Sequence, residues 1–301
     1  MLHYIEESVT MKSILLTGGT GFLGSALLRA LITGFDVTVL KRTTSRTDRV
    51  ADLLHHDRIR WIDLDKTDLP ELFTSQHFDV ILHCATNYGR GKRSILDTAS
   101  ANLLLPLTLL QLGIEHGVKT FINTDTVIDK RVNEYSLSKK QFLEWLQNAA
   151  GKIQSVNIAL EHFYGPFDDE SKFTTMIFHK LMRGEPSIDL TPGDQKRHFI
   201  YIDDVVRAFC CILDKLDNLP SGFSSFEVST EQSISIREFV LLAKSITGNT
   251  STQLNFGAIP YRANELMDSR TDISALKALG WRPEVSLKKG IQLTIEKESI
   301  K

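Results

Sequence analysis

The sequence predicts an α/β fold, in which a doubly wound parallel sheet is followed by a smaller α+β C-terminal portion. Three observations predict it. Short apolar segments alternate with longer segments of helical periodicity, this rhythm changes after residue 166, and the length of 301 residues suits two domains or one large α/β unit. We place the first domain at residues 11–165 and the second portion at residues 166–301, with residues 197–228 expected to pack back on the sheet.

The predicted strands are short apolar runs bounded by turn residues. Runs of this kind are typical of strands that are buried on both faces of a sheet. Their repeated alternation with helices predicts parallel pairing, because each helix returns the chain to the same end of the sheet. The strands are expected at residues 13–17, 37–40, 59–64, 80–83, 120–123 and 155–159, with a further short strand at 226–228.

The predicted helices follow the spacing of apolar residues. Leu23, Leu27 and Leu31 recur every four residues and so lie on one face of the first helix. Similar spacing is found between the later strands and beyond residue 166. The helices are expected at residues 22–32, 94–116, 135–150, 172–183, 203–216, 235–247 and 273–279.

Composition and charge exclude several classes of protein. With 42% hydrophobic and 24% charged residues, the chain is ordinary for a folded protein and not for a disordered one. Thirty-five basic and 37 acidic side chains give a net charge of −2, so no overall charge attracts nucleic acid or an anionic membrane. We therefore expect a folded protein without a nucleic-acid partner.

No segment of the sequence predicts a membrane span, a signal peptide or a metal site. The most apolar stretch, residues 101–114, is interrupted by Asn102 and Pro106 and falls short of the ~20 residues needed to cross a bilayer. The first ten residues contain no basic segment followed by an apolar core. Three cysteines are too few for a disulfide framework, and no cluster of histidines and carboxylates has metal-ligand spacing. We expect a cytoplasmic protein with reduced cysteines, no metal and no membrane partner.

A glycine-rich segment joins the first predicted strand to the first predicted helix. Gly18, Gly21 and Gly24 recur there at three-residue intervals. Gly18 allows a tight turn, Gly21 lets the backbone approach a pyrophosphate, and Gly24 lets the helix pack closely on the strand. The start of the helix offers free N–H groups and its positive dipole end to phosphates. The segment predicts dinucleotide binding by a Rossmann domain; the alternative is a structural loop without a ligand.

The end of the second strand indicates which dinucleotide is bound. A site for NAD usually has an acidic residue there, about 20 residues beyond the glycines, to bind the ribose 2′-hydroxyl. Here the strand ends in Lys41 and Arg42, whereas Asp36 lies at its beginning. Two cations suit a 2′-phosphate, so we expect NADP, used as NADPH. The alternative is a solvated surface pair, with NAD as the cofactor.

A tyrosine and a lysine stand four residues apart in the predicted helix 135–150. Tyr135 and Lys139 therefore lie on one face of that helix. The nearby ammonium is expected to lower the pKa of the phenol towards the working range of a proton donor. Thr124, at the end of the preceding strand, supplies a hydroxyl to the same substrate oxygen. The three residues suit hydride transfer to or from a carbinol carbon, with an exposed i,i+4 pair as the alternative.

From about residue 12 to residue 295, the chain resembles the extended short-chain dehydrogenase/reductases of the nucleotide-sugar epimerase/dehydratase family. Within that family it is most similar to the reductases of nucleotide-linked 4-keto-6-deoxyhexoses, the CDP-abequose synthase group. Besides the glycine segment and the Tyr135–Lys139 pair, the segments that carry the resemblance are 83–86, Asn102, 121–125, 160–166, 193–204, 256–259, 264–267 and 279–283.

The resemblance implies a role for individual residues. Thr124, Tyr135 and Lys139 match the catalytic triad, with Lys139 also on the nicotinamide ribose. Arg197 and Arg262 match arginines that hold the ribose and diphosphate of the sugar nucleotide, for which surface ion pairs are the alternative. The implied cofactor-binding residues are Gly18, Thr20, Gly21, Phe22, Leu23, Gly24, Lys41, Arg42, Asp63, Leu64, Ala85, Thr86, Tyr135, Lys139 and His162. The implied substrate-binding residues are Asn87, Thr124, Asp125, Arg197 and Arg262.

Several positions depart from the family pattern. The family's 4,6-dehydratases carry a second acid directly after the position of Asp125, where this chain has Thr126, so loss of water is not expected. Asp125 itself either contacts the substrate or caps a turn. Ala159 and His162 stand where relatives often have arginine and asparagine. His162 is either a contact to the substrate or nicotinamide or a structural histidine.

These observations lead to three hypotheses of function. The first is NADPH-dependent reduction of a CDP- or dTDP-linked 4-keto-6-deoxyhexose, in deoxysugar, O-antigen or capsule polysaccharide biosynthesis, with residues 166–301 mainly binding the substrate. The second is a nucleotide-sugar epimerase with tightly bound NAD. The third is a non-catalytic NADP-binding regulator. Relatives pair through helices such as those at 94–116 and 135–150, so the resemblance also implies a homodimer.

Overall fold

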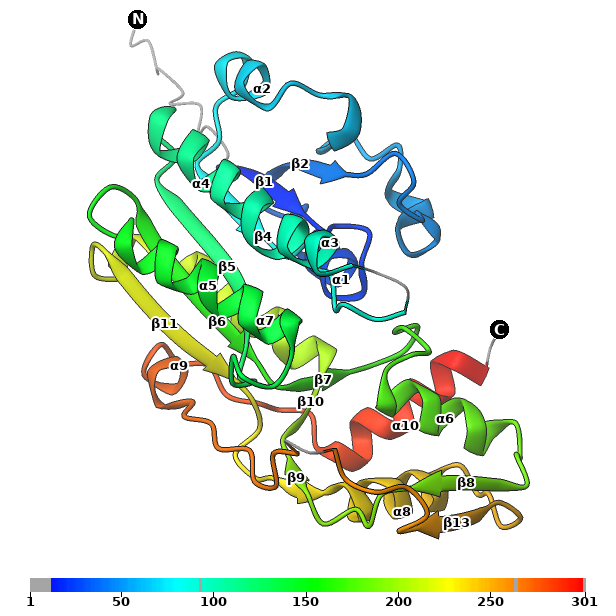
Figure 1. Ribbon diagram of the computed structural model, residues 1–301. Helices are drawn as coiled ribbons and strands as arrows, with labels where there is room; N and C mark the ends of the chain where they lie inside the picture. Colours follow the sequence, from blue (N-terminus) through cyan, green and yellow to red (C-terminus); the bar gives the residue numbers. More distant parts are fainter. Residues whose placement is uncertain (1–11, 92–93, 263–264, 300–301) are drawn as a thin grey trace, which may run out of the picture.

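The central feature of the molecule is a parallel sheet of seven strands, in the order β11-β6-β5-β4-β1-β2-β3 (Figure 1). Every neighbouring pair in it is parallel. The structure, a computed structural model, describes residues 12–91, 94–262 and 265–299. The predicted α/β fold is confirmed. The strands of the sheet are β1 (Ser13–Thr17), β2 (Asp36–Lys41), β3 (Ile59–Asp63), β4 (Val80–His83), β5 (Thr120–Thr126), β6 (Gln154–Leu160) and β11 (Phe223–Val228).

The strand order reverses at β1, which lies between β2 and β4. The chain runs from β1 outwards through β2 and β3, and then returns to the other side of β1 with β4, β5 and β6. In doubly wound folds, ligands bind at the carboxyl ends of the strands that flank this point. The glycine segment follows β1 and residues 84–91 follow β4, so the fold directs both loops to the expected ligand position.

Helices cover both faces of the sheet (Figure 1). Alternate residues of a strand point to opposite faces, so Ile14 and Leu16 join one buried cluster while Leu15 joins the other. The first face is covered by α1 (Phe22–Leu31) and α7 (Ile202–Asp214), which contact each other. The second face is covered by α2 (Leu69–Ser75), α4 (Leu105–Glu115) and α5 (Glu134–Asn148).

The helical segment predicted at residues 94–116 is not one regular helix. It consists of α3 (Ile95–Ala99) and α4, joined by a π-helical turn at Ser100–Leu104. The wide turn lies at Asn102, which is fully buried.

The strand predicted at residues 59–64 also differs slightly from the structure. It ends at Asp63, because Leu64 begins a 3-10 turn.

The segment Ile95–Glu115 is, within the described ranges, the helix whose length and composition would allow it to cross a membrane. It has 21 residues and is therefore longer than the apolar stretch at residues 101–114. Its second half packs on the sheet, where Leu109 and Leu112 share a buried cluster with Ile81 and Phe121. This contact accounts for the apolar residues of the second half, whereas Ile95, Leu96 and Leu104 are exposed.

Residues beyond β6 build the smaller portion at the carboxyl edge of the sheet (Figure 1). Short strands pair there as β7 with β10, β8 with β13 and β9 with β12. Residues 202–228 leave this portion to add α7 and β11 to the main sheet. The remaining elements are β7 (His162–Tyr164), α6 (Phe173–Met182), β8 (Ser187–Leu190), β9 (Lys196–Arg197), β10 (Phe199–Tyr201), β12 (Ile234–Ser235), α8 (Ile236–Ile246), β13 (Gln253–Phe256), α9 (Ser274–Ala278) and α10 (Leu287–Ser299).

Candidate active site

The glycine segment forms the turn between β1 and α1. Gly18 has a left-handed φ of 72°, and a Cβ there would lie 2.6 Å from the backbone nitrogen of Ala85, in the loop after β4. A Cβ on Gly24 would lie 2.1 Å from the carbonyl oxygen of Gly18. Gly21 is the N-cap of α1 and no described side chain caps this helix end, so its first N–H groups remain available to a ligand. These features fit the pyrophosphate of a dinucleotide.

Thr20, Phe22 and Leu23, which are also predicted to bind the cofactor, lie in the same turn or at the start of α1. Their side chains differ in burial, since Leu23 is part of the buried core whereas Thr20 and Phe22 are half-buried. Phe22 stacks on Phe163, with ring centroids 5.9 Å apart. Leu23 therefore contributes only its backbone to a ligand at this turn.

Replacing Gly24 with alanine is expected to weaken binding of a dinucleotide cofactor about tenfold, because overpacking that moves a backbone costs about 1–3 kcal/mol. The added methyl group would collide with the carbonyl oxygen of Gly18 and separate α1 from β1. Gly34 is the matched control, since a Cβ there would meet no atom within 4 Å. Fluorescence titration with NADH and with NADPH, and thermal melts of both variants, would measure the effect. Equal behaviour of the two variants would contradict this explanation.

The cations predicted for the adenosine end of the cofactor lie beside the end of β3. Lys41 and Asp63 are register partners in β2 and β3, and their side chains form an ion pair. The hydrogen bond from Lys41 holds the pKa of Asp63 below its usual value. Arg42, which follows Lys41, is exposed. Leu64 follows Asp63 directly after the end of β3. The structure thus brings the four predicted residues to one edge of the sheet, with part of the charge of Lys41 balanced by Asp63.

A buried asparagine ties the loop after β4 to α5. Asn102 Oδ1 accepts hydrogen bonds from the Asn87 backbone N–H at 2.7 Å and from the Thr86 hydroxyl at 3.2 Å. Its Nδ2 donates to the Asn87 carbonyl at 2.8 Å and to Ser138 Oγ at 3.0 Å. The loop with Ala85, Thr86 and Asn87 is thereby fixed next to the helix with Lys139. The sequence predicts no role for Asn102, although a polar residue within an apolar helix is the signal of such a link.

Lys139, on the second turn of α5, is buried without a partner. It is 1% exposed, and its Nζ has no hydrogen-bond acceptor among the described residues. Burial lowers the pKa of Lys139 to about 8, against the charges of Asp125 and Cys84, which raise it. A buried ammonium without an acceptor is unfavourable for folding. Its position fits a ligand that brings acceptors of its own, such as the hydroxyls of a nicotinamide ribose.

Tyr135, on the first turn of α5, lies against the ring of Tyr88, with ring centroids 5.0 Å apart. Burial raises the pKa of Tyr135, and the charges of Tyr88 and Asp125 raise it further, whereas a hydrogen bond with Thr126 lowers it. The predicted lowering of this pKa by Lys139 is therefore wrong. Spacing along a helix places the two residues on one face, but it does not show how deeply the phenol is buried. Tyr135 is held in its protonated form, which is the state of a proton donor.

Thr124 and Asp125 lie near the end of β5, where both are buried. The Thr124 hydroxyl donates to the carbonyl oxygen of His83 at 3.0 Å. Asp125 accepts hydrogen bonds from Lys140 Nζ at 2.8 Å and from Asn157 Nδ2 at 3.2 Å. Asp125 is thus part of an ion pair that connects β5 to α5.

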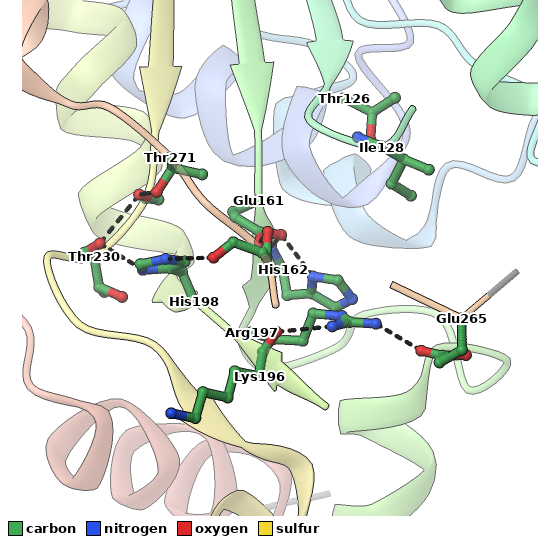
Figure 2. A network of polar contacts seen from close by, with 12 residues as sticks. Thr126, Ile128, Glu161, His162, Lys196, Arg197, His198, Thr230, Glu265 and Thr271 are labelled. Atoms are coloured by element: carbon green, nitrogen blue, oxygen red, sulfur yellow. Dashed lines mark hydrogen bonds and ion pairs between the residues drawn. The ribbon is translucent and has the colours of Figure 1, made fainter. Parts of the chain in front are cut away.

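The two arginines predicted for the sugar nucleotide lie in the C-terminal portion. The Arg197 guanidinium, on β9, forms an ion pair with Glu265 at 2.6 Å and donates to the Lys196 carbonyl at 2.7 Å (Figure 2). Arg262 is exposed on the loop after β13. Glu265 is a residue for which the sequence predicts no role, since its partner is 68 residues away.

His162, on β7, lies close to Arg197. The register partner of His162 in β10 is Phe199, which follows Arg197 by two residues. Figure 2 shows the imidazole of His162 near the guanidinium of Arg197. Nδ1 of His162 is 2.7 Å from the carboxylate of Glu161. The carboxyl edge of the sheet therefore holds His162 and Arg197 together. Among the described residues, no group of three or more histidines, cysteines and carboxylates could hold a metal ion.

Comparison with models of protein families shows which family the chain belongs to. The model of the NAD dependent epimerase/dehydratase family matches residues 14–225, which is more than half of the chain. The chain belongs to this family. The predicted resemblance is thereby confirmed, as is the prediction of an NAD(P)-dependent enzyme.

Relatives of this epimerase/dehydratase family member match it over almost its whole length. CDP-abequose synthases from Salmonella typhimurium and Salmonella muenchen are 34% and 35% identical over 291 and 292 residues, which cover 93% of the chain and 96% of each relative. A UDP-glucose 4-epimerase from Mycolicibacterium smegmatis is 27% identical over 312 residues, covering 94% of the chain and 97% of that relative.

Solved structures share the fold of this family member. UDP-glucuronic acid 4-epimerase from Bacillus cereus, in complex with UDP-glucuronic acid and NAD, superposes with a TM-score of 0.84 at 22% identity, over 96% of this chain and 99% of that one. UDP-glucose 4-epimerase from Thermotoga maritima, with UDP-glucose, gives a TM-score of 0.83 at 24% identity, over 96% and 100%. At these identities the likeness shows the fold.

Proposed function

We propose that this enzyme uses NADPH to reduce a CDP- or dTDP-linked 4-keto-6-deoxyhexose, in the biosynthesis of deoxysugars for O-antigen or capsule polysaccharides. The observation that carries the proposal is the presence of Thr124 near the end of β5 and of Tyr135 and Lys139 on the first two turns of α5, in a chain similar over its length to CDP-abequose synthases. Thr126 favours reduction over dehydration, because it places a hydroxyl where dehydratases have an acid.

The protein groups suit the protonation of a carbonyl oxygen. NADPH, when bound, supplies the hydride for the carbonyl carbon of the sugar. Tyr135, which is protonated at neutral pH, donates its proton to the carbonyl oxygen. The Thr124 hydroxyl orients that oxygen, and Lys139 holds the nicotinamide ribose. The N–H groups at the start of α1 hold the diphosphate of the dinucleotide.

The choice of NADP rests on the end of β2. Lys41 and Arg42 both provide cations for a 2′-phosphate, and Arg42 is the more exposed of the two. No acidic side chain stands at the end of β2 itself. A reductase also draws on the reduced NADP pool, so the cofactor and the reaction support each other.

Loss of NADPH absorbance, measured with a panel of CDP- and dTDP-linked 4-keto-6-deoxy sugars and with NADH in parallel, tests the proposed function. We expect rapid loss with one sugar nucleotide and NADPH, which would also identify the nucleotide. A clear preference for NADH would refute the role of Lys41 and Arg42. Rearrangement of a sugar nucleotide without consumption of NADPH would refute the reductase.

A nucleotide-sugar epimerase with retained NAD is the second candidate. The ion pair between Lys41 and Asp63 favours it, because this pair reduces the positive charge near the position of a 2′-phosphate. Such an enzyme would carry bound NAD through purification and would need no added cofactor. A non-catalytic NADP-binding regulator is the third candidate; it would keep its cellular function when Tyr135 is replaced with phenylalanine.

We propose that two copies of the chain pair through α3, the π-helical turn and α5. These neighbouring elements expose large apolar side chains, of which Leu96 is 76% exposed. The others are Ile95, Leu104, Leu137 and Trp145. Isologous burial of such a surface is the common way in which homodimers form.

Replacing Leu96 with aspartate is expected to convert the dimer into a monomer. Pairing of the two copies would bury the new carboxylate in an apolar interface, where an unpaired charge is strongly unfavourable. Leu241, which is 50% exposed on α8, is the control position, and its replacement with aspartate should leave the dimer intact. Light scattering measures the mass of each protein. A monomeric wild type, or dissociation of both variants, would remove the assignment of the dimer to this surface.

A further inference from the structure

A buried carboxylate with no part in the proposed reaction lies at the end of β6, where the sheet meets the C-terminal portion (Figure 2). Glu161 is 5% exposed. Its Oε2 accepts a hydrogen bond from the His162 backbone N–H at 2.9 Å and lies 2.7 Å from His162 Nδ1. Its Oε1 accepts a hydrogen bond from the Ser269 hydroxyl.

The charge on Glu161 determines which nitrogen of His162 carries a hydrogen. Burial raises the pKa of Glu161, but the hydrogen bonds from His162 and Ser269, together with the charges of His162 and His198, outweigh burial, so this pKa lies below its usual value. The carboxylate is therefore ionised and can only accept hydrogen bonds. It follows that Nδ1 of His162 is the donor. Nε2 is the nitrogen that remains, and within the described ranges it has no hydrogen-bond partner.

The ring of His162 is fixed on one side and open on the other. Glu161 holds Nδ1, and the ring packs edge-on against Phe199 with centroids 5.9 Å apart. The side chain is nevertheless 38% exposed. Because Phe199 is two residues from Arg197, the open side of the imidazole lies near the guanidinium proposed for the sugar nucleotide.

The Glu161 carboxylate also contacts the segment that contains Glu265, the ion-pair partner of Arg197. Ser269, which donates to Glu161, follows Glu265 by four residues. The Ser269 carbonyl lies 3.2 Å from His198 Nε2, and Nδ1 of that ring is 2.8 Å from the Thr230 carbonyl. A purely structural role of Glu161 would act through this connection, so the two roles can be separated by experiment.

We propose that Glu161 is a positioning residue for the sugar-nucleotide site: its carboxylate holds His162 in the Nδ1–H form, and Nε2 accepts a hydrogen bond from a hydroxyl group of the sugar nucleotide beside Arg197. The identity of this ligand rests on the function proposed above. The tautomer of a histidine is set by the hydrogen bond that its other nitrogen makes. A side chain held in one form before binding also loses less freedom when the ligand arrives.

The tautomer of His162 can be measured by NMR in the intact protein at alkaline pH. The wild type should show the Nδ1–H form. Glu161→Leu removes the acceptor and should lose this form, whereas Glu161→Gln keeps an accepting oxygen and should retain it. Ser269→Ala interrupts only the connection to the C-terminal segment and should also retain it. An Nε2–H form in the wild type, or an unchanged tautomer in Glu161→Leu, would overturn the proposal.

Turnover of CDP-4-keto-6-deoxyglucose separates positioning from a structural role. Glu161→Leu and His162→Phe should each raise the sugar-nucleotide KM about tenfold, the effect of one lost hydrogen bond, with kcat changed less than about threefold. The KM for NADPH should stay constant, and the double variant should resemble His162→Phe alone. Additive effects, or an equal rise in KM for Ser269→Ala, would overturn the proposal. If the wild type reduces no sugar nucleotide, the proposed function fails, while the NMR result still decides whether Glu161 positions His162.

Discussion

Replacing Lys139 with methionine is expected to make the protein more stable and inactive at once. The ammonium is buried without an acceptor among the described residues, and its pKa is lowered from 10.5 to about 8. A shift of this size corresponds to roughly 3 kcal/mol of unfavourable free energy at neutral pH. Because methionine fills similar space without a charge, the free energy of unfolding should rise by about 1–3 kcal/mol. Turnover should fall about a hundredfold or more, because the group proposed to hold the nicotinamide ribose in position is lost.

The gain in stability should depend on pH in a defined direction. The unfolded chain keeps the proton on Lys139 up to about pH 10.5, whereas the folded protein releases it near pH 8. Between these values the unfolded state binds more protons, so the stability of the wild type rises with pH. The advantage of Lys139→Met should therefore be largest below pH 8 and decrease towards pH 10. Urea unfolding of both proteins at several pH values would measure it, and a constant difference would refute the explanation.

The neighbouring lysine is the matched control. Lys140 forms an ion pair with the buried Asp125 at 2.8 Å, and its side chain is 22% exposed. Lys140→Met would leave that carboxylate buried without its cation, which should lower the free energy of unfolding by about 2–3 kcal/mol. Two adjacent lysines are thus expected to change stability in opposite directions. A loss of stability in both variants would show that burial of the ammonium is not what makes Lys139 unfavourable.

Replacing Tyr135 with phenylalanine is expected to reduce kcat by about 10²–10⁴, the usual contribution of a positioned proton donor. The ring keeps its contact with Tyr88, so NADPH should bind normally, and loss of the hydrogen bond with Thr126 should lower the free energy of unfolding by only about 1 kcal/mol. Single-turnover measurements with NADPH and the sugar nucleotide would separate the chemical step from binding. A variant with normal turnover would remove Tyr135 from the mechanism.

Tyr88→Phe is the control for this substitution. It removes a hydroxyl from the same aromatic pair but leaves both rings in contact, so turnover should change less than about threefold. A loss as large as that of Tyr135→Phe would show that the pair acts through its packing and not through the proton of Tyr135.

Most of the main sheet can be predicted from the sequence, because each strand is a local apolar run between turn residues. β1 and β4 have the predicted bounds. α2 escapes prediction because only Leu72 and Phe73 are buried, which is too few for a helical period to be recognised. Short strands such as β9 and β12 have two residues each, so no alternation can identify them.

The candidate site divides in the same way. The glycine turn and the spacing of Tyr135 and Lys139 are local features, and the sequence predicts them directly. The interactions of Lys41 with Asp63, of Arg197 with Glu265, and of Glu161 with Ser269 join residues 22 to 108 positions apart. Single-sequence patterns do not indicate which distant carboxylate a given cation will meet. Burial is also a property of the whole fold, which is why the pKa of Tyr135 moves against the expectation.

The place of β11 in the sheet imposes an order of folding on the chain. β6 has β5 on one side and β11 on the other, but the ribosome makes residues 161–222 before it reaches β11. Until Val228 has emerged, the nascent sheet presents the outer edge of β6, a strand whose residues from Ser155 to Leu160 are all buried in the finished protein. Open edges of this kind recruit other strands. Early release or proteolysis near residue 165 should therefore yield an aggregating fragment instead of a free-standing dinucleotide-binding domain.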